Sequence, residues 1–528
     1  MKKIVYNSFI ILTLVASMGC KKWLDVNKNP NGPEETAANL YLGPMLYYVL
    51  QSEQWDGMFV GQYTQNWAHI EEKNTWDTMG FRPPPRDDGG ETWKLTYYFL
   101  GKNLEDMMRL AEAEKRWDVL GVGYVLKALG FQRSTDMYGE LVIKQLGETE
   151  RTSFDYDSQE YAYEEVRRLL NLAIENLQRT DGAVSTSYLA KGDNVYNGVK
   201  EKWLKFTYGM LALNLSHLTN GKPGYDGDKI IEYVNKSFVG NVDNALFTHT
   251  GGTNAKSNFY GQRRGNLNSY RQTDFIVGLM DGTAFTGAVD PRMSRMIWPS
   301  KSGKFKGLTT TYTAAQTIPV ADDRPYSFLN TTGNVAITSI GRYLFDDVAR
   351  VPFMTYSQLQ FVKAEAALRK GYRDVAMDAY KKGIEAHIDF VNTTNAGVTG
   401  GTATQITPTE KTTFMSNVNV VPASNADLTL SHILCQKYIA QWAWGFTETW
   451  TDLRRFHYTD LDPQTGVQVF RGFTPPEVTR LYADNLGKVC YRMKPRYASE
   501  YVWNTAALEK IGGLNLDFTT YPLWFVNP

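Results

Sequence analysis

The sequence contains little cysteine: three residues among 528. So few cysteines exclude a small fold that is held together by a network of disulfides. Two of them, Cys435 and Cys490, lie in the body of the chain. In an exported protein they could pair with each other, and the alternative is that each is a buried free thiol. The third, Cys20, follows an apolar run and needs a separate explanation.

Long apolar runs are also scarce. The longest, residues 4–15, is shorter than the roughly 20 residues that a membrane-spanning helix requires. Hydrophobic residues nevertheless make up 43% of the chain, which suffices for a packed core. The sequence therefore predicts a globular body that does not itself cross a membrane.

Neither sign of charge is in excess. The chain has 56 basic and 56 acidic residues, and removal of Lys2 and Lys3 with the first 19 residues would leave 54 basic against 56 acidic. A protein that binds nucleic acid concentrates positive charge to neutralise phosphates. The near-neutral balance, without a long run of either sign, therefore argues against a nucleic-acid partner.

Motifs that would carry catalysis or bind a metal are missing as well. The six histidines are scattered without the spacing of a zinc site, and no G-x-S-x-G elbow or phosphate-binding loop occurs. We therefore expect no metal, no cofactor and no enzymatic activity. A helical glycoside hydrolase stays open as an alternative, because Glu448 with Asp452, or Asp87 with Asp88, could supply two carboxylates about 5–10 Å apart.

The N-terminus has the pattern of a lipoprotein signal peptide. Lys2 and Lys3 precede the apolar residues 4–15, and a Ser-Met-Gly step then precedes Cys20. Cleavage after residue 19 would leave Cys20 as the lipid-modified first residue, and several acyl chains would anchor it lastingly. A signal peptide followed by an incidental cysteine is the alternative.

Three consecutive parts are expected along the chain. Residues 1–19 are predicted to be the lipoprotein signal peptide and 20–39 a lipidated tether, because the turn-rich NKNPNG has no apolar periodicity. Residues 40–528 are predicted to form a single domain.

Within this domain, the apolar periodicity divides the sequence into helical and irregular parts. Apolar residues recur every three or four positions over about 40–240 and 354–460, which predicts amphipathic helices, the last of them over 432–456. Sequence rich in Gly, Thr, Ser and Asn over about 241–350 predicts a loop-rich insertion, and the tail after 460 is expected to be irregular.

One pair of predicted helices has the spacing of a tetratricopeptide repeat. Thr355 and Gln358 form a potential capping box at its start. Small residues and one aromatic follow at the positions where two helices approach closely: Ala364, Ala367, Gly371, Ala376, Tyr380 and Gly383. We therefore predict a mainly α fold, an α-solenoid core of tetratricopeptide-type helix pairs with long irregular loops.

Several short motifs predict local contacts rather than chemistry. Asp136 is expected to accept backbone N–H groups in a turn, and Gly139 to adopt a positive φ. Two further side-chain pairs are predicted, an ion pair of Asp290 with Arg292 and a cation–π contact of Trp450 with Arg454.

Aromatic residues are plentiful, at 13% of the chain. Flat rings stack on sugars or peptide side chains while Arg and Asn bind polar edges. Two loop-like stretches hold such residues and supply the candidate ligand-binding residues, which are Trp67, Trp76, Phe81 and Arg86 in the first stretch and Tyr260, Arg263, Asn268 and Tyr270 in the second. The alternative is that rings such as Trp67 and Trp76 only pin their loop to the solenoid.

Seven stretches together resemble the SusD/RagB family of nutrient-binding outer-membrane lipoproteins. They are CKKWLDVNKNPNGP, STDMYGELV, NVYNGVKEKWLKFTYGMLALNLSH, DPRM, MTYSQLQFVKAEAALRKG, ETWTDLRRFHY and KPRYASEYVWN. Their order and spacing carry the resemblance, which runs from Cys20 to near the C-terminus. Lys21 and Lys22 stand where acidic residues often favour surface export in the family.

This resemblance implies a function. It implies a lipoprotein anchored in the outer membrane and facing outward, which captures an oligosaccharide, or a peptide, and delivers it to a SusC-like TonB-dependent transporter. A protein-interaction scaffold, a common use of tetratricopeptide repeats, is the remaining alternative.

Overall fold

The computed structural model describes residues 36–81, 86–148, 150–331, 341–395 and 405–527. The predicted signal peptide, Cys20 and most of the tether lie outside these residues, so lipidation stays a prediction. Within the described part of the chain, no helix is both long and apolar enough to cross a membrane.

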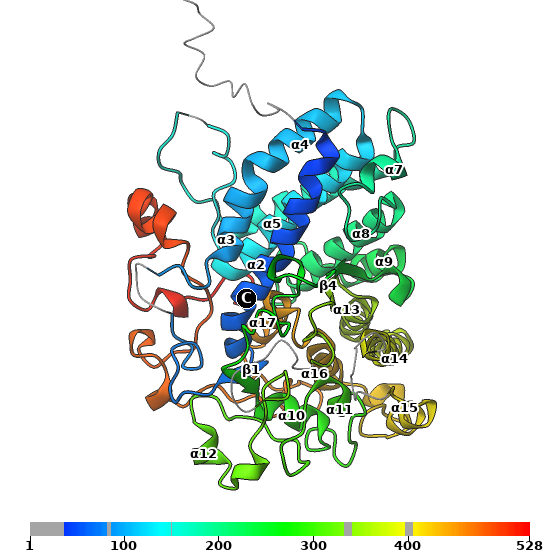
Figure 1. Ribbon diagram of the computed structural model, residues 1–528, viewed down its shortest axis with the longest axis vertical. Helices are drawn as coiled ribbons and strands as arrows, with labels where there is room; N and C mark the ends of the chain where they lie inside the picture. Colours follow the sequence, from blue (N-terminus) through cyan, green and yellow to red (C-terminus); the bar gives the residue numbers. More distant parts are fainter. Residues whose placement is uncertain (1–35, 82–85, 149, 332–340, 396–404, 528) are drawn as a thin grey trace, which may run out of the picture.

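The first half of the domain is a stack of helices, as the apolar periodicity predicts. These helices are α2 (Leu42–Tyr63), α4 (Gly101–Ala113), α5 (Trp117–Tyr138), α6 (Gln159–Gln178), α8 (Lys200–Ser216) and α9 (Gly227–Lys236). In the order α5, α6, α8, α9, each packs against the next. Figure 1 shows how α8 and α9 continue down one side of the molecule into α13 and α14. The antiparallel stacking of neighbours is the arrangement of an α-solenoid.

The tetratricopeptide-type pair consists of α13 (Tyr356–Arg369) and α14 (Arg373–Asn395). Tyr380 is fully buried, meets the ring of Phe361 edge-on, and donates to Val420 O. A Cβ on Gly383 would lie 2.8 Å from the Phe361 ring, so glycine is what permits this close approach. The small-residue spacing is thus confirmed in its packing role.

The start of α13 confirms only half of the expected capping box. Thr355 Oγ1 accepts the N–H of Gln358 at 3.2 Å, but Gln358 Oε1 has no hydrogen-bond partner. The cap therefore satisfies one helix N–H through Thr355 alone.

The prediction of a single helix over 432–456 is wrong. The structure has two helices, α16 (Leu430–Gln441) and α17 (Phe446–Arg455). Ala443 between them has a φ of +71°, and its N–H donates to Asn66 Oδ1. A partner more than 300 positions away in the sequence thus stabilises a backbone turn that local periodicity does not reveal.

The region 241–350 is largely irregular, as expected, but two small strand pairs tie it to the helical core. β1 (Trp67–His69) pairs with β3 (Tyr270–Gln272), and β2 (Ala245–Thr248) pairs with β4 (Arg350–Met354), both antiparallel. The remaining helices are short: α3 (Glu91–Lys94), α7 (Thr186–Leu189), α10 (Asp274–Met280), α11 (Met293–Met296), α12 (Ala314–Thr317), α15 (Pro408–Met415) and α18 (Thr505–Lys510).

Two segments are π-helical: Leu95–Leu100, between α3 and α4, and Tyr497–Tyr501, just before α18. Segments of this kind are uncommon in proteins and are frequently found at functional sites. Both segments are therefore candidates for the neighbourhood of a ligand site.

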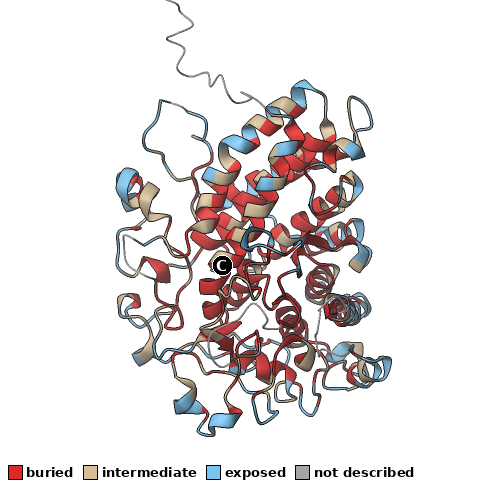
Figure 2. Ribbon diagram, viewed as in Figure 1, coloured by how far each residue is buried: buried red, intermediate tan, exposed pale blue. Residues whose placement is uncertain are grey.

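Burial follows the helix stack, with buried residues along its inner faces and exposed residues at its rim (Figure 2). Cys435 and Cys490 are both buried free thiols and form no disulfide. This decides between the two alternatives that the sequence left open.

The predicted local pairs are present, with one exception. Arg292 forms a buried ion pair with Asp290, and the guanidinium of Arg454 lies 3.8 Å from the Trp450 ring centre. Gly139 has a φ of +89°, as expected. The turn role of Asp136 is wrong, because Asp136 lies inside α5 and accepts side-chain bonds.

Candidate functional site

The two candidate stretches from the sequence are neighbours in space. The pairing of β1 with β3 places His69 opposite Tyr270, and the rings of Trp67 and Tyr260 meet edge-on with centres 5.5 Å apart. The structure therefore brings the two stretches together, a contact that no local sequence pattern predicts.

Four of the candidate rings are buried instead of being presented to solvent. Trp67, Trp76 and Tyr260 are at most 1% exposed and Phe81 is 9% exposed. Trp76 packs between Phe59 and Phe81, with ring centres 4.6 and 5.1 Å away. The expectation of exposed rings is thus wrong for these four side chains, because they fill the junction between the stretches and α2.

The other four candidates lie nearer the surface. Arg86 is exposed, and Arg263 forms an ion pair with Asp347 at 3.1 Å. Asn268 and Tyr270 are half-buried, and Asn268 Oδ1 has no hydrogen-bond partner. These residues supply polar groups but no exposed ring platform.

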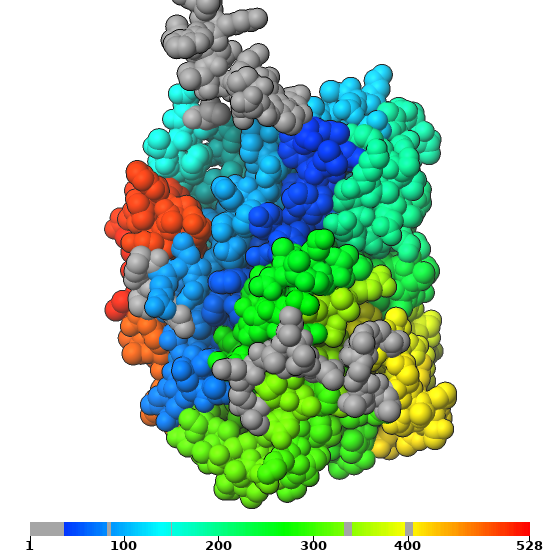
Figure 3. All heavy atoms as spheres, in the orientation of Figure 1, coloured from blue at the N-terminus to red at the C-terminus, as the bar shows by residue number. Residues whose placement is uncertain are grey.

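A different surface has the shape and chemistry of a binding site. It is an open cleft of about 920 Å³, which we call the aromatic cleft. Figure 3 shows orange-red residues near the C-terminus lying against blue and cyan residues of the first half, and segments from these two parts form the cleft. Its aromatic lining consists of Tyr48, Trp55, Trp93, Tyr97, Tyr98, Phe99, Phe154 and Trp503.

Two of these rings are strongly exposed. Tyr98 is 70% exposed and Trp503 is 74% exposed, which is unusual for side chains of this size. Phe99 and Tyr48 stack in parallel with ring centres 3.7 Å apart, and Tyr98 meets Phe99 edge-on. The exposed Tyr98 ring thus stands on a rigid aromatic base, while Trp503 comes from the opposite end of the sequence.

The two π-helical segments supply part of the wall. The segment Leu95–Leu100 carries Tyr97, Tyr98 and Phe99 on successive positions, and Tyr497–Tyr501 precedes Trp503. The wider turn of a π-helix changes which side chains share a face. Both segments therefore aim aromatic side chains in directions that an α-helical wheel does not predict.

A buried carboxyl group fixes the start of α3 beside the cleft. Asp56 on α2 accepts the N–H groups of Glu91 and Thr92, at 3.2 and 2.7 Å. Burial outweighs these hydrogen bonds and raises the pKa of Asp56 to about 7. These two hydrogen bonds tie the start of α3, which leads into the Tyr98 segment, to α2.

The opposite wall is held by an amide clamp. Asn504 accepts the N–H of Phe154 and donates to Phe154 O, both at 2.9 Å, and donates to Glu500 Oε2. Tyr156 also donates to Glu500. Burial and the Glu500 carboxylate raise the pKa of Tyr156 well above its usual range, so Tyr156 stays a hydrogen-bond donor. The clamp joins residues 350 positions apart.

The cleft also offers polar edges. Lys94 forms an ion pair with Glu91 and lies 4.9 Å from the Phe99 ring centre. Arg496 lies 3.6 Å from Asp87, and Ser499 Oγ has no hydrogen-bond partner. Apolar rings surrounded by charged and hydroxyl groups suit a ligand that has both apolar faces and polar edges.

Sequence reasoning missed Tyr98 and Trp503. The run TYYF offered a signal, because three consecutive aromatics on a helix cannot all face the core. Trp503 lies in KPRYASEYVWN, which we used only for the family resemblance. Nothing in the sequence places it near Tyr98, because the two are 405 positions apart.

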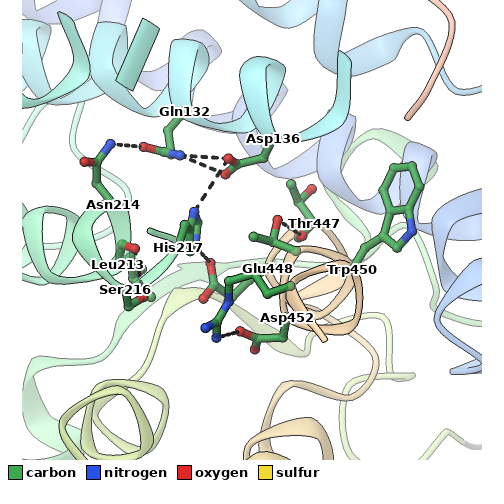
Figure 4. Close-up of polar contacts among 12 residues, drawn as sticks. Gln132, Asp136, Leu213, Asn214, Ser216, His217, Thr447, Glu448, Trp450 and Asp452 are labelled. Carbon is green, nitrogen blue, oxygen red and sulfur yellow. Dashed lines mark hydrogen bonds and ion pairs between the residues drawn. The ribbon is translucent and has the colours of Figure 1, made fainter. Parts of the chain in front are cut away.

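Glu448 and Asp452, the first carboxylate pair considered for hydrolysis, lie in a buried ionic network (Figure 4). Lys437 contacts both carboxylates, at 2.9 and 2.8 Å, and Glu448 also contacts His217. Burial raises the pKa of Glu448, but Lys437 and His217 outweigh it and hold that pKa well below its usual range. Glu448 therefore stays ionised and cannot act as the protonated acid of a glycosidase in this setting.

Asp87, of the second pair, has a structural role. Its carboxylate accepts the N–H of Tyr497 and its backbone oxygen accepts that of Gly90. Asp88 lies in the same turn and is half-buried. Among the described residues, no group of three or more His, Cys, Asp or Glu side chains could hold a metal ion.

Comparison with known families gives a match over most of the chain. Residues 30–475 match a SusD-like family model described as starch-binding and associating with the outer membrane. No curated protein sequence matches the chain.

Solved structures share the fold. A SusD/RagB family protein from Bacteroides thetaiotaomicron is 22% identical with a TM-score of 0.70, over 93% of this chain and 99% of that chain. A SusD homologue from Bacteroides fragilis is 17% identical with a TM-score of 0.67, over 93% and 100%. A chitin-binding SusD homologue from Flavobacterium johnsoniae is 20% identical with a TM-score of 0.64, over 93% and 99%. At these identities the likeness concerns the fold.

Proposed function

The chain belongs to the SusD-like family, and we propose that it captures an oligosaccharide in the aromatic cleft and delivers it to a SusC-like TonB-dependent transporter. The protein acts as a binding protein anchored to the outer membrane through Cys20 and facing outward. A peptide is the second ligand class that this kind of site accommodates.

The pair of exposed rings carries this proposal. Tyr98 and Trp503 line one cleft, are more than two-thirds exposed, and belong to segments that are fixed by buried contacts. An exposed ring contributes little to the stability of the fold, and its flat apolar face can stack on a pyranose ring. Gln51, Arg496 and Ser499 on the same wall are suited to the hydroxyl groups at the sugar's edge.

An oligosaccharide is favoured over a peptide by the make-up of the cleft. The volume of about 920 Å³ is large enough for several sugar residues in a row. Its charged groups include both signs, Glu91 with Lys94 and Arg496 with Glu500. Because the cleft holds charges of both signs, it gives a charged ligand no electrostatic advantage over a neutral one. The chitin-binding relative of the same fold agrees with this ligand class.

A binding role is also favoured over hydrolysis. Lys437 pairs with half-buried Glu448 and with buried Asp452, and neither carboxylate lines the aromatic cleft. Purified protein is therefore expected to release no reducing sugar from glycans that it binds.

The transporter partnership rests on family membership. The domain has no helix that crosses the membrane among its described residues, so passage of the ligand needs another protein. A tagged copy is expected to co-purify with a large β-barrel protein in mild detergent. If it brings down no such protein, the delivery step has no support.

A glycan and peptide array on purified protein, followed by titration of the best ligand, tests the binding role. The variants Tyr98→Ala and Trp503→Ala are each expected to weaken binding by about 1–3 kcal/mol with an unchanged melting temperature. Tyr372→Ala is the control, because Tyr372 is also exposed, at 44%, but does not line the cleft. Parent-like binding by both cleft variants would show that the ligand lies elsewhere.

A further inference from the structure

A second open pocket lies between α10, the segment 308–312 and the segment 467–477. Its volume is about 620 Å³, and it shares no lining residue with the aromatic cleft. Its wall is rich in hydroxyl and amide side chains, among them Gln65, Thr309, Thr310, Thr474 and Gln468. Such a wall suits a hydroxylated ligand better than an apolar one.

One cation on this wall is held in place without a carboxylate partner. Arg471 Nε donates to Ser431 Oγ at 2.7 Å and Nη1 donates to Ala284 O at 3.0 Å, while the guanidinium lies 4.9 Å from the Phe285 ring centre. Within the described chain, Arg471 forms no ion pair and its Nη2 donates no hydrogen bond. The guanidinium of Arg471 is therefore held in one orientation and has N–H donors left for a ligand.

The positive charge of Arg471 affects the pKa of the neighbouring His432. Burial and then the positive charge of Arg471 lower the pKa of His432 to about 4, although Asp462 opposes the shift. His432 is therefore neutral at physiological pH, and Arg471 is the cation that a ligand at this wall would meet.

Two residues that line the same pocket have a strained backbone. Gln65 has a φ of +55° and Thr311 a φ of +72°, a conformation that is rare for a β-branched residue. Gln65 is fixed through Nε2 to Thr474 O at 2.7 Å, and Thr311 O accepts from Lys73 and Arg480. Strained residues that the surroundings hold in place are frequent at ligand sites.

We propose that this pocket binds a short acidic sugar of one or two uronic-acid units, with one carboxylate paired to Arg471 and the sugar hydroxyls bonded to the threonine and glutamine wall. Two acidic residues, Asp274 and Glu477, also line the pocket. Asp274 accepts from Thr309 at 2.7 Å, and Glu477 accepts from Tyr312 at 3.4 Å. The carboxylates of Asp274 and Glu477 repel a long ligand with many negative charges. The pocket is therefore expected to take only a short acidic sugar.

The test titrates the whole soluble domain with digalacturonate, with neutral galactobiose and with acetyl-alanyl-alanine. Digalacturonate is expected to bind at least tenfold more tightly than galactobiose, with an affinity that falls as salt rises. Arg471→Gln is expected to lower the digalacturonate affinity at least tenfold, whereas Trp503→Ala leaves it unchanged. Arg373→Gln is the matched control, because Arg373 bonds Leu428 O and does not line the pocket.

A second measurement on the parent protein does not depend on the folding of a variant. Digalacturonate next to Arg471 is expected to raise the pKa of His432, read from its ring resonances by NMR. Equal binding of digalacturonate and galactobiose, an unmoved His432, or tighter binding of acetyl-alanyl-alanine would each overturn the proposal. Failure of these results leaves the aromatic cleft and its ligand untouched, because Tyr98 and Trp503 lie outside this pocket.

Discussion

At the scale of single residues, the buried ionic network is where charge contributes most to the fold. His217 lies between the carboxylates of Asp136 on α5 and Glu448 on α17 (Figure 4). Lys437 and Arg455 extend the network to Asp452 on α17 and to a carboxylate of α13. Arg455 pairs with Glu365 and Asp452, at 2.9 and 2.6 Å. A buried pair that loses one member leaves the other charge uncompensated, so each link in this network is sensitive to substitution.

His217 predicts how stability changes with pH. Burial lowers its pKa, but Glu448 and Asp136 outweigh burial and raise it to about 9, against 6.5 in an unfolded chain. The stabilisation is therefore complete below pH 6.5 and is lost as pH rises through 9. The shift corresponds to about 3 kcal/mol.

Thermal unfolding of the parent protein and of His217→Gln at a series of pH values measures this effect. The parent is expected to lose stability between pH 6.5 and 9, and the variant to lose much less over that range. His457→Gln is the control, because His457 is half-exposed at the surface. A variant with the same pH profile as the parent would show that His217 does not carry the dependence.

Substitution of Trp76 is expected to affect stability, in contrast to substitution of the cleft rings. Trp76 is 1% exposed and packs against Phe59, Tyr63 and Phe81. Trp76→Ala is expected to lower the free energy of unfolding by about 3–5 kcal/mol, because it leaves a cavity in the core. Trp503→Ala, measured beside it by urea unfolding, is expected to change that energy little. Loss of binding by Trp76→Ala at unchanged stability would return Trp76 to the ligand site.

At the scale of elements, what the sequence revealed was the local part of the fold. The apolar period predicts α5, α6 and α8, and the small-residue spacing predicts the packing of α13 on α14. The break at Ala443 depends on Asn66, a contact that no local pattern contains. The candidate stretches failed for a related reason, since polar neighbours do not show whether a ring such as Trp67 turns inward.

The clamp between Asn504 and Phe154 gives a prediction for the cleft wall. Asn504→Ala removes the hydrogen bonds that join the C-terminal segment to residues 150–157. Faster amide hydrogen exchange in 150–157 and a fivefold to tenfold loss of ligand affinity are expected, with a stability loss of about 1–2 kcal/mol. Thr505→Ala is the control, because its hydroxyl bonds only Tyr501 O within the same segment. Unchanged exchange in 150–157 would show that the clamp does not order the wall.

At the scale of the whole molecule, the aromatic cleft is a product of chain topology. Its walls come from residues 48–55, 91–99, 142–146, 152–154 and 496–504, which the fold brings together. Family membership shows the fold, but the candidate residues taken from the sequence include neither Tyr98 nor Trp503. The identity of this site therefore came from side-chain exposure and not from the sequence.

Membrane attachment is a prediction for the intact protein in its cell. With Cys20 as the modified residue, the mature protein is expected to partition into detergent and to incorporate labelled fatty acid. Cys20→Ala is expected to abolish both, whereas Cys435→Ala, a change at a buried thiol, leaves labelling intact. Labelling that survives Cys20→Ala would exclude the predicted anchor.

The central claim is that the aromatic cleft is where the oligosaccharide binds. A crystal structure of the soluble domain, soaked with the best oligosaccharide from the array, tests it directly. We expect sugar density in the cleft, with a pyranose ring stacked on Tyr98 or Trp503. Sugar density found only at another surface, with both rings uncovered, would contradict it.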